Sequence, residues 1–204
     1  MALPAFSDAA GHRAETAPGA DNGSTVLADD SGKVLARNAA PGRATFDLPR
    51  EKGWYRLTVD ATRTSPDPVM WMLGTSVTSE WRLRSGHEKS AAPARLLDLD
   101  YQLPLSGENA ADPEKPLDYT VGLTAQGDAK ALPIASLKVW YATDGTGWKP
   151  ATAARGADGR WKVTVPALGT AKVDLRSTVT DASGASLTET LIDAYNSGCA
   201  DIWC

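Results

Sequence analysis

The sequence predicts an all-β protein built from two tandem antiparallel β-sandwich domains. Three observations lead to this fold class. Many short segments alternate apolar and polar residues with the period of two that half-buried strands show. Gly, Pro, Asn and Asp separate these segments. No convincing amphipathic helix longer than two turns is found.

A first series of predicted strands fills the N-terminal part of the chain. Two short apolar runs surround Asp29-Asp30-Ser31-Gly32, a composition typical of a tight hairpin turn. Residues 44–49, 53–63 and 76–85 alternate strictly, and we expect a strand in each. The side chains expected on one face of these strands are Ala44, Phe46, Leu48, Tyr55, Leu57, Val59, Ala61, Val77, Ser79, Trp81 and Leu83.

A second series begins after a small, polar stretch that reads as a linker. About seven strands with turns every 8 to 12 residues or so predict an immunoglobulin- or fibronectin-like sandwich. Two of the turns are Asp144–Gly147 and Asp181–Gly184. The predicted divisions are a first sandwich (1–86), a linker (87–95), an immunoglobulin-like sandwich (96–195) and a cysteine-containing tail (196–204).

Residues 74–76 spell Gly-Thr-Ser, the tripeptide around the nucleophile of subtilisin-like peptidases. Such a serine begins a buried helix whose N–H groups stabilise the oxyanion, whereas Ser76 is followed by a strand pattern. His12 and His87 lie in polar, loop-like segments, and the order Asp30, Ser76, His87 differs from the subtilisin order Asp, His, Ser. Asp30-Ser31-Gly32 also has the aspartic peptidase pattern, but reads as an exposed turn. The sequence therefore predicts no catalytic residue and no enzyme.

Acidic residues gather near the start of the second series, at Asp98, Asp100, Asp112, Glu114 and Asp118. Ca²⁺ prefers several converging oxygen ligands, but the spacing fits no EF-hand loop, and a solvated acidic loop is favoured. Two separated histidines and two terminal cysteines give no zinc ligand set. We expect no metal and no cofactor.

Trp148 and Trp161 are the candidate binding aromatics. Trp148 follows the Asp-Gly-Thr-Gly turn, and Trp161 begins an alternating strand. Exposed tryptophans form sugar platforms in carbohydrate-binding modules, whereas tryptophans on alternating strands more commonly pack in the core or under turns. Exposure of Trp148, Trp161 and Trp71 would distinguish the two.

The tail holds the only cysteines, Cys199 and Cys204. A disulfide between them would close a small, strained ring, and the alternatives are a tether between chains, a site of modification or a free thiol.

A net charge of −4 without a Lys/Arg cluster argues against nucleic-acid binding. No apolar run approaches the length of a membrane span. The N-terminus lacks signal-peptide features and begins as if cut from a longer protein. The oligomeric state is not predicted.

Six stretches carry a family resemblance across nearly the whole chain: "LPAFSDAAGH" (3–12), "WYRLTVDATRTSP" (54–66), "TSVTSEWRLRSGH" (75–87), "LLDLDYQLPLSGENAA" (96–111), "LKVWYATDGTGWKPA" (137–151) and "VDLRSTVTDASGASLTETLIDAY" (173–195). With them the chain resembles the C-terminal accessory region of secreted actinobacterial subtilisin-like serine peptidases. The resemblance implies a secreted protein whose catalytic residues lie in a separate domain upstream. It also implies β-domains that stabilise the peptidase domain, position substrate or bind surfaces.

We therefore expect a non-catalytic accessory or interaction module whose partner is a peptidase catalytic domain or a protein substrate. The alternative is an independent binding module for cell-wall glycan or a protein. A third hypothesis is a scaffold that presents the Cys199–Cys204 tail for modification or cyclisation.

Overall fold

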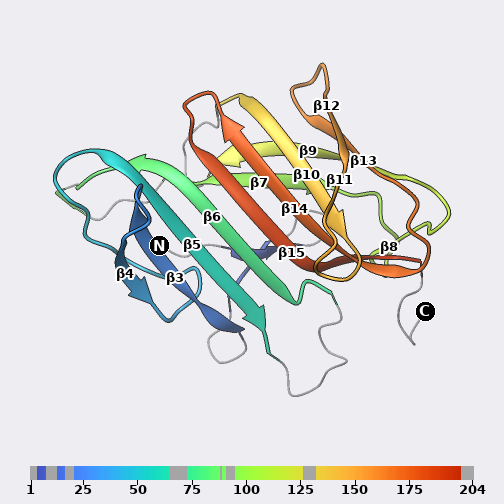
Figure 1. Cartoon of the computed structure of the whole chain (residues 1–204), viewed down its shortest axis with the longest axis horizontal. Helices are drawn as coiled ribbons and strands as arrows, with labels where there is room; N and C mark the ends of the chain where they lie inside the picture. Colours follow the sequence, from blue (N-terminus) through green and yellow to red (C-terminus); the bar gives the residue numbers. More distant parts are fainter. Residues whose placement is uncertain are drawn as a thin grey trace.

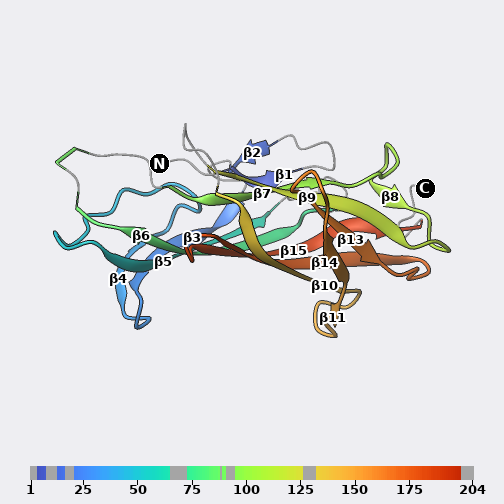
Figure 2. The same cartoon turned by 90° about the horizontal axis from the view of Figure 1, so that it is seen from above.

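The chain folds into two antiparallel β-sheets packed face to face, with a short two-stranded ribbon beside them (Figures 1 and 2). The computed structural model describes residues 4–7, 13–16, 21–64, 73–87, 89–90, 95–125 and 132–198. The all-β prediction is confirmed, since these residues contain strands, turns and loops and no helix. In particular, nothing among them could serve as a bilayer-spanning helix.

The larger sheet has nine strands, in the order β11-β10-β14-β15-β6-β5-β3-β4 with β8 paired to β15, and the smaller has the order β12-β13-β9-β7. The strands are β1 (Pro4–Ser7), β2 (Arg13–Glu15), β3 (Asp21–Asp29), β4 (Val34–Asn38), β5 (Gly53–Arg63), β6 (Ser76–Ser85), β7 (Leu97–Gln102), β8 (Ala110–Ala111), β9 (Leu117–Ala125), β10 (Ile134–Ala142), β11 (Lys149–Pro150), β12 (Thr152–Arg155), β13 (Trp161–Val165), β14 (Ala171–Asp181) and β15 (Ser186–Ser197). β1 and β2 form the ribbon.

Strands of both predicted domains share the large sheet. β6 pairs antiparallel with β15, from Ser76 opposite Ile192 to Arg82 opposite Ser186. One buried cluster likewise contains Leu57 of β5 and Val163 of β13. The division into two domains with a linker at 87–95, and the immunoglobulin-like character of the second, stay predictions.

The alternation predicted for β5 and β6 matches the observed burial. The four predicted inward residues of β5 and the four of β6 are all buried. The period of two places them on one side of the sheet. The larger apolar ones join the core shared with the small sheet, whereas Ala61 and Val77 pack with Phe6 of β1. Trp81 also ties the two layers together, because its indole Nε1 donates a 2.7 Å hydrogen bond to the carbonyl oxygen of Leu97 on β7.

The turn predicted at Asp29–Gly32 joins β3 to β4. The Asp29 carboxylate accepts hydrogen bonds from the backbone N–H and hydroxyl of Ser31 and from the N–H of Lys33, and Gly32 has φ +89°. The strand predicted at 44–49 is wrong, because this segment joins neither main sheet. Phe46 and Leu48 nevertheless pack against the core, so the alternation reports burial there and not strand pairing.

Two hairpins project on the side of the large sheet that faces away from the small one. Figure 2 shows the β3–β4 hairpin and the β10–β11 hairpin extending from this side, near opposite ends of the sheet. The outward side of β5, β6, β15, β14 and β10, here called the outer face, lies between them. No described strand packs over it (Figure 2).

Candidate functional site

The first feature of the outer face is an arginine stacked on a tryptophan beside the β3–β4 hairpin. The Arg82 guanidinium carbon lies 4.1 Å from the centre of the Trp54 ring. Asp30, in the turn of the hairpin, accepts hydrogen bonds from Arg82 Nε at 2.8 Å and Nη2 at 3.0 Å. This two-bond ion pair fixes the plane of the guanidinium over the indole. The hydrogen bond from Arg82 also lowers the pKa of Asp30.

A second stack of the same kind lies beside the β10–β11 hairpin. Arg176 of β14 has its guanidinium carbon 4.1 Å from the centre of the Trp148 ring, and its Nε donates a 3.1 Å hydrogen bond to Thr190 Oγ1. The hairpin tip is ordered by Asp144, whose Oδ1 accepts from the backbone N–H groups of Thr146 and Gly147 at 2.9 and 2.8 Å. These two backbone N–H groups lower the pKa of Asp144.

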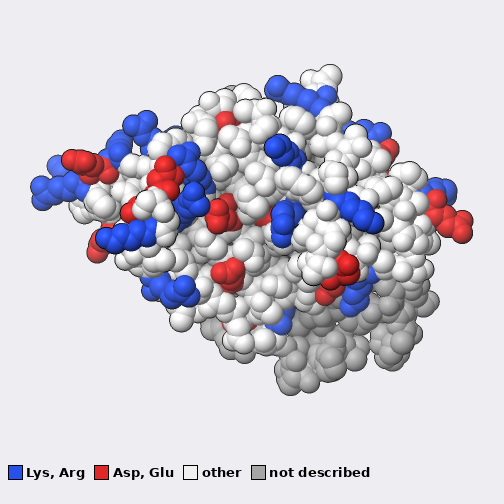
Figure 3. Space-filling model, in the orientation of Figure 1, with Lys and Arg blue, Asp and Glu red and all other residues white. Residues whose placement is uncertain are grey.

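Hydroxyl groups and mixed charges occupy the outer face between the stacks. Thr178 and Thr188 share a 3.0 Å hydrogen bond across β14 and β15, and Thr78 donates to Asp60 at 3.0 Å across β6 and β5. Figure 3 shows this face with positive and negative side chains intermingled and most dense towards the end formed by β3, β5 and β6. The surface has no field of a single sign, so it suits a partner with mixed polar and aromatic chemistry better than a polyanion.

The residues weighed for catalysis lie apart. Ser76 begins β6, where its Oγ lies 3.1 Å from Thr62 Oγ1 and donates to the carbonyl oxygen of Ala61 at 3.3 Å. Neither partner is a base. His87 is exposed, while His12 lies outside the described residues. Asp30 is engaged with Arg82 as described above.

Three of the acidic residues of the second series form ion pairs. Asp100 pairs with Arg160 at 2.7 Å, Asp112 with Lys115 at 2.7 Å, and Asp118 with Lys162 at 2.8 Å. Each of these three carboxylates has a different cationic partner, and the three do not converge on a common centre. Within the described ranges, no three His, Cys, Asp or Glu side chains are grouped to hold an ion.

The two candidate aromatics lie on different sheets. Trp148 is half-buried under Arg176 on the outer face, whereas Trp161 begins β13 of the small sheet and packs against the core. Their rings therefore do not form one platform. Trp71, Cys199 and Cys204 lie outside the described residues. Binding by Trp148 or Trp161, and the chemistry of the tail, stay predictions.

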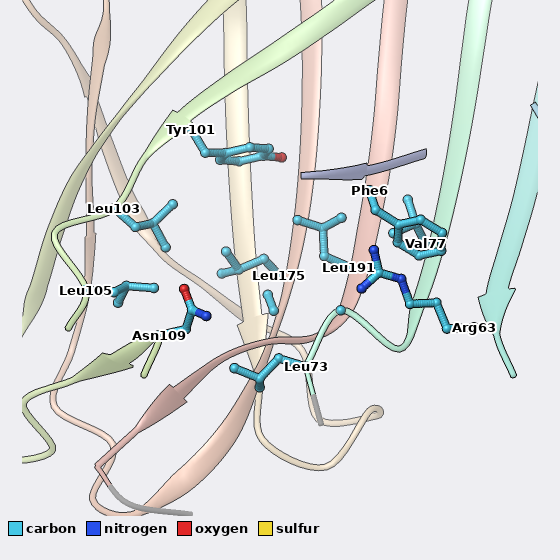
Figure 4. Close-up of a pocket in the computed structure, with 12 residues that line it drawn as sticks. Phe6, Arg63, Leu73, Val77, Tyr101, Leu103, Leu105, Asn109, Leu175 and Leu191 are labelled. Carbon is cyan, nitrogen blue, oxygen red and sulfur yellow. The ribbon is translucent and has the colours of Figure 1, made fainter. Parts of the chain in front are cut away.

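A cavity of about 150 Å³ lies between the sheets (Figure 4). Val77, Leu175 and Leu191 line it from the large sheet, and Tyr101, Leu103 and Leu105 line it from β7 and the segment that follows. Sequence reasoning missed this site, because its residues come from segments far apart in the chain and share no local motif.

A row of polar side chains crosses the inner face of the large sheet near this cavity. Ser79, Glu189 and Ser177 are neighbours across β6, β15 and β14, and Ser79 Oγ donates to Glu189 Oε2 at 3.4 Å. The hydroxyl of Tyr101 lies near Glu189 and Ser177 but makes no hydrogen bond of normal geometry with a described residue. Burial, reinforced by the charge of Glu189, raises the pKa of Tyr101 well above its usual value.

No protein-family model matches the chain, and no curated protein does either. The resemblance to peptidase accessory regions therefore stays a prediction.

Proposed function

We propose that this chain is a non-catalytic interaction module that accompanies a secreted subtilisin-like serine peptidase. Its partner is the peptidase domain or a protein substrate, bound on the outer face of the large sheet. The observation that carries the proposal is the pair of Arg–Trp stacks, Arg82 on Trp54 and Arg176 on Trp148, near the two ends of a sheet face that no described strand covers. The choice of a peptidase as the partner rests on the family resemblance described above.

The chemistry of this face favours a protein partner. Tryptophan and arginine dominate the residues that contribute most to protein–protein affinity. An arginine already held on a ring loses less conformational freedom when a partner binds. The intermingled charges between the stacks provide rim contacts that set orientation more than affinity.

Binding of unfolded casein, used as a model protein substrate, tests the proposal by biolayer interferometry. We expect the double variant Arg82→Ala/Arg176→Ala to weaken casein binding at least about tenfold. Arg155→Ala, an exposed arginine of β12 on the small sheet, is the matched control and should bind as the wild type. Equal binding by all three proteins would contradict the use of the outer face. A peptidase domain encoded upstream in the same reading frame would support the proposed partnership.

The non-catalytic part of the proposal has a separate test. A fluorophosphonate probe that reacts with activated serines should leave the chain unlabelled. Labelling that disappears in Ser76→Ala would overturn this part of the proposal, whatever the casein result.

One observation favours a second candidate, a cell-wall glycan module. Trp148 lies at a projecting hairpin with one ring face under Arg176, and the opposite face could stack on a sugar. Sedimentation with insoluble peptidoglycan that is lost in Trp148→Ala and retained in Arg155→Ala would support this candidate. For the tail hypothesis, intact mass with and without reductant distinguishes a Cys199–Cys204 ring from two thiols.

A further inference from the structure

The inter-sheet cavity has walls that are apolar on both layers. Val77, Leu175 and Leu191 rise from the large sheet, Leu103 and Leu105 face them, and Phe6 of β1 covers one side. Figure 4 shows these side chains surrounding a common space. Protein interiors are close-packed, and the apolar side chains that border this partly open space lack packing contacts on the side that faces it. An apolar ligand would restore those contacts.

Three polar groups border the same space. The end of the Arg63 side chain points towards Leu191, and its guanidinium carbon lies 3.9 Å from the centre of the Phe6 ring. Asn109 lines the cavity from a backbone conformation with φ +55°. The Tyr101 hydroxyl is the third group, on a side chain only 6% exposed and without a hydrogen-bond partner among the described residues.

We propose that this cavity binds a small monocarboxylic acid whose apolar body has about the size of a benzene ring. The carboxylate lies at Arg63, and the apolar body lies between Leu175, Leu191 and the opposite leucines. Tyr101 marks the inner end of the cavity and accepts or donates one hydrogen bond to a polar substituent of the ligand. This inference concerns the inner face and is independent of the function proposed for the outer face.

The volume sets the size of the ligand. A volume of about 150 Å³ accommodates a benzene-sized molecule. Water beside the leucines lacks the two to four polar partners that it needs, and finds them only at the border, near Arg63, Asn109 and Tyr101. A long acyl chain or a folded peptide segment exceeds the volume.

The positive charge of Arg63 at the rim of the cavity determines the chemical class of the ligand. Burial lowers the pKa of Arg63, and the charge of Asp21 opposes this shift. Asp21 lies opposite Arg63 on the neighbouring strand, so a ligand carboxylate would share the guanidinium with it. Stacking on Phe6 occupies a face of the guanidinium, while its N–H donors lie in the plane of the group and suit a carboxylate. A cationic ligand would be repelled at this rim, and a neutral one would lack the ion pair.

The test uses benzoate and hexanoate as probes, with benzyl alcohol and benzylamine as the neutral and cationic analogues of benzoate. Titration of the full chain, followed by isothermal calorimetry or by NMR shifts, should give saturable benzoate binding with Kd of about 1 mM or tighter. Benzyl alcohol should bind at least about tenfold more weakly, and benzylamine more weakly still.

Two variants locate the site. Ala194→Phe adds a ring inside the cavity and should abolish benzoate binding, whereas Ala154→Phe, which adds the same ring on exposed β12, should leave it unchanged. Arg63→Gln should weaken benzoate at least about tenfold without changing benzyl alcohol, and Arg155→Gln is its matched control.

Three outcomes would overturn the inference. These are no saturable benzoate binding up to about 10 mM, equal affinity for benzoate and benzyl alcohol, or unchanged binding by folded Ala194→Phe. If Ala194→Phe does not fold, Leu191→Phe replaces it. Nuclear Overhauser contacts from the benzoate ring to the methyl groups of Leu175 and Leu191 need no variant at all. Their presence in the wild type supports the inference, and contacts to other methyl groups alone contradict it.

Discussion

The two faces of the large sheet are built from the same strands but depend on different interactions. On the inner face, Leu175 and Leu187 are 1% and 0% exposed and belong to the common core. On the outer face, Thr188 and Arg176 are half-buried and interact through single hydrogen bonds and ring contacts. Successive residues of one strand therefore lie either in the core or on the face that we propose for recognition. Substitutions one position apart should separate the two contributions.

The largest effect is expected from Leu187→Ala on β15. Removal of a fully buried leucine leaves a cavity that the surrounding core fills only in part, and should lower the free energy of unfolding by about 3 to 5 kcal/mol. Thr188→Ala, its neighbour on the outer face, should cost about 1 kcal/mol or less, since it removes only the hydrogen bond to Thr178. Urea denaturation of both variants measures the difference. Similar losses would mean that the two faces do not differ in this way.

A smaller loss is expected from Trp81→Phe. The change keeps an aromatic ring in the core but leaves the carbonyl of Leu97 without its indole donor, at a cost of about 1 to 3 kcal/mol. Trp54→Phe on the outer face is the control, because a phenyl ring still stacks with Arg82 and the Trp54 indole has no hydrogen bond to a described residue. Hydrogen exchange should show faster opening of the amide protons of β6 and β7 in Trp81→Phe alone. Equal exchange in the two variants would show that this bond does not tie the layers together.

The sequence predicts the strands well and the site poorly, for one physical reason. Period-two patterns are local, so β5, β6 and the hairpin at Asp29–Gly32 are identified from neighbouring letters. Pairing of β6 with β15 depends on residues more than a hundred positions apart, and no local pattern specifies it. The cavity needs that same pairing, because it brings Val77 beside Leu191. Trp148 is a candidate in the sequence because it follows a recognisable turn, but nothing local predicts that Arg176 covers it.

Three tyrosines in the core between the two sheets give the protein a pH dependence at the alkaline end. Burial raises the pKa values of Tyr101, Tyr119 and Tyr195 far above the ordinary tyrosine value. Above about pH 10 the unfolded chain releases phenolic protons that the folded chain retains. The free energy of unfolding should therefore fall as the pH rises, by about 1.4 kcal/mol per pH unit for each such tyrosine.

Tyr119→Phe tests this dependence, since the Tyr119 hydroxyl is buried without a hydrogen-bond partner among the described residues. The variant should have a slope about 1 kcal/mol per pH unit shallower than the wild type between about pH 10 and 11, and the difference should approach about 1.4 kcal/mol per pH unit at higher pH, where the unfolded tyrosine is fully ionised. Denaturation at several alkaline pH values gives the slope, and absorbance of tyrosinate reports the titration. A variant with the wild-type slope would show that Tyr119 titrates equally in both states.

The smallest effect is expected on the outer face, in the stack that Asp30 anchors. The hydrogen bond from Arg82 lowers the pKa of the exposed Asp30 carboxyl. The contribution of this ion pair to stability is therefore present above the ordinary aspartate pKa, and it is lost as the pH falls through the lowered pKa of Asp30 in the folded protein. Arg82→Gln should return the Asp30 titration towards the ordinary value of about 3.8, measured by NMR of the side-chain carboxyl carbon.

Asp144 provides the matched control within the same spectra. Its pKa is lowered by backbone N–H groups of Gly147 and Thr146 in the other hairpin, and not by an arginine. Arg82→Gln should therefore leave the Asp144 titration unchanged while it shifts that of Asp30. Because exposed ion pairs contribute little to stability, the midpoint of urea unfolding near neutral pH should hardly change. If Asp30 keeps its low pKa without Arg82, the hairpin turn and not the ion pair lowers the pKa of this carboxyl. The ion pair would then not explain how Arg82 is held on Trp54.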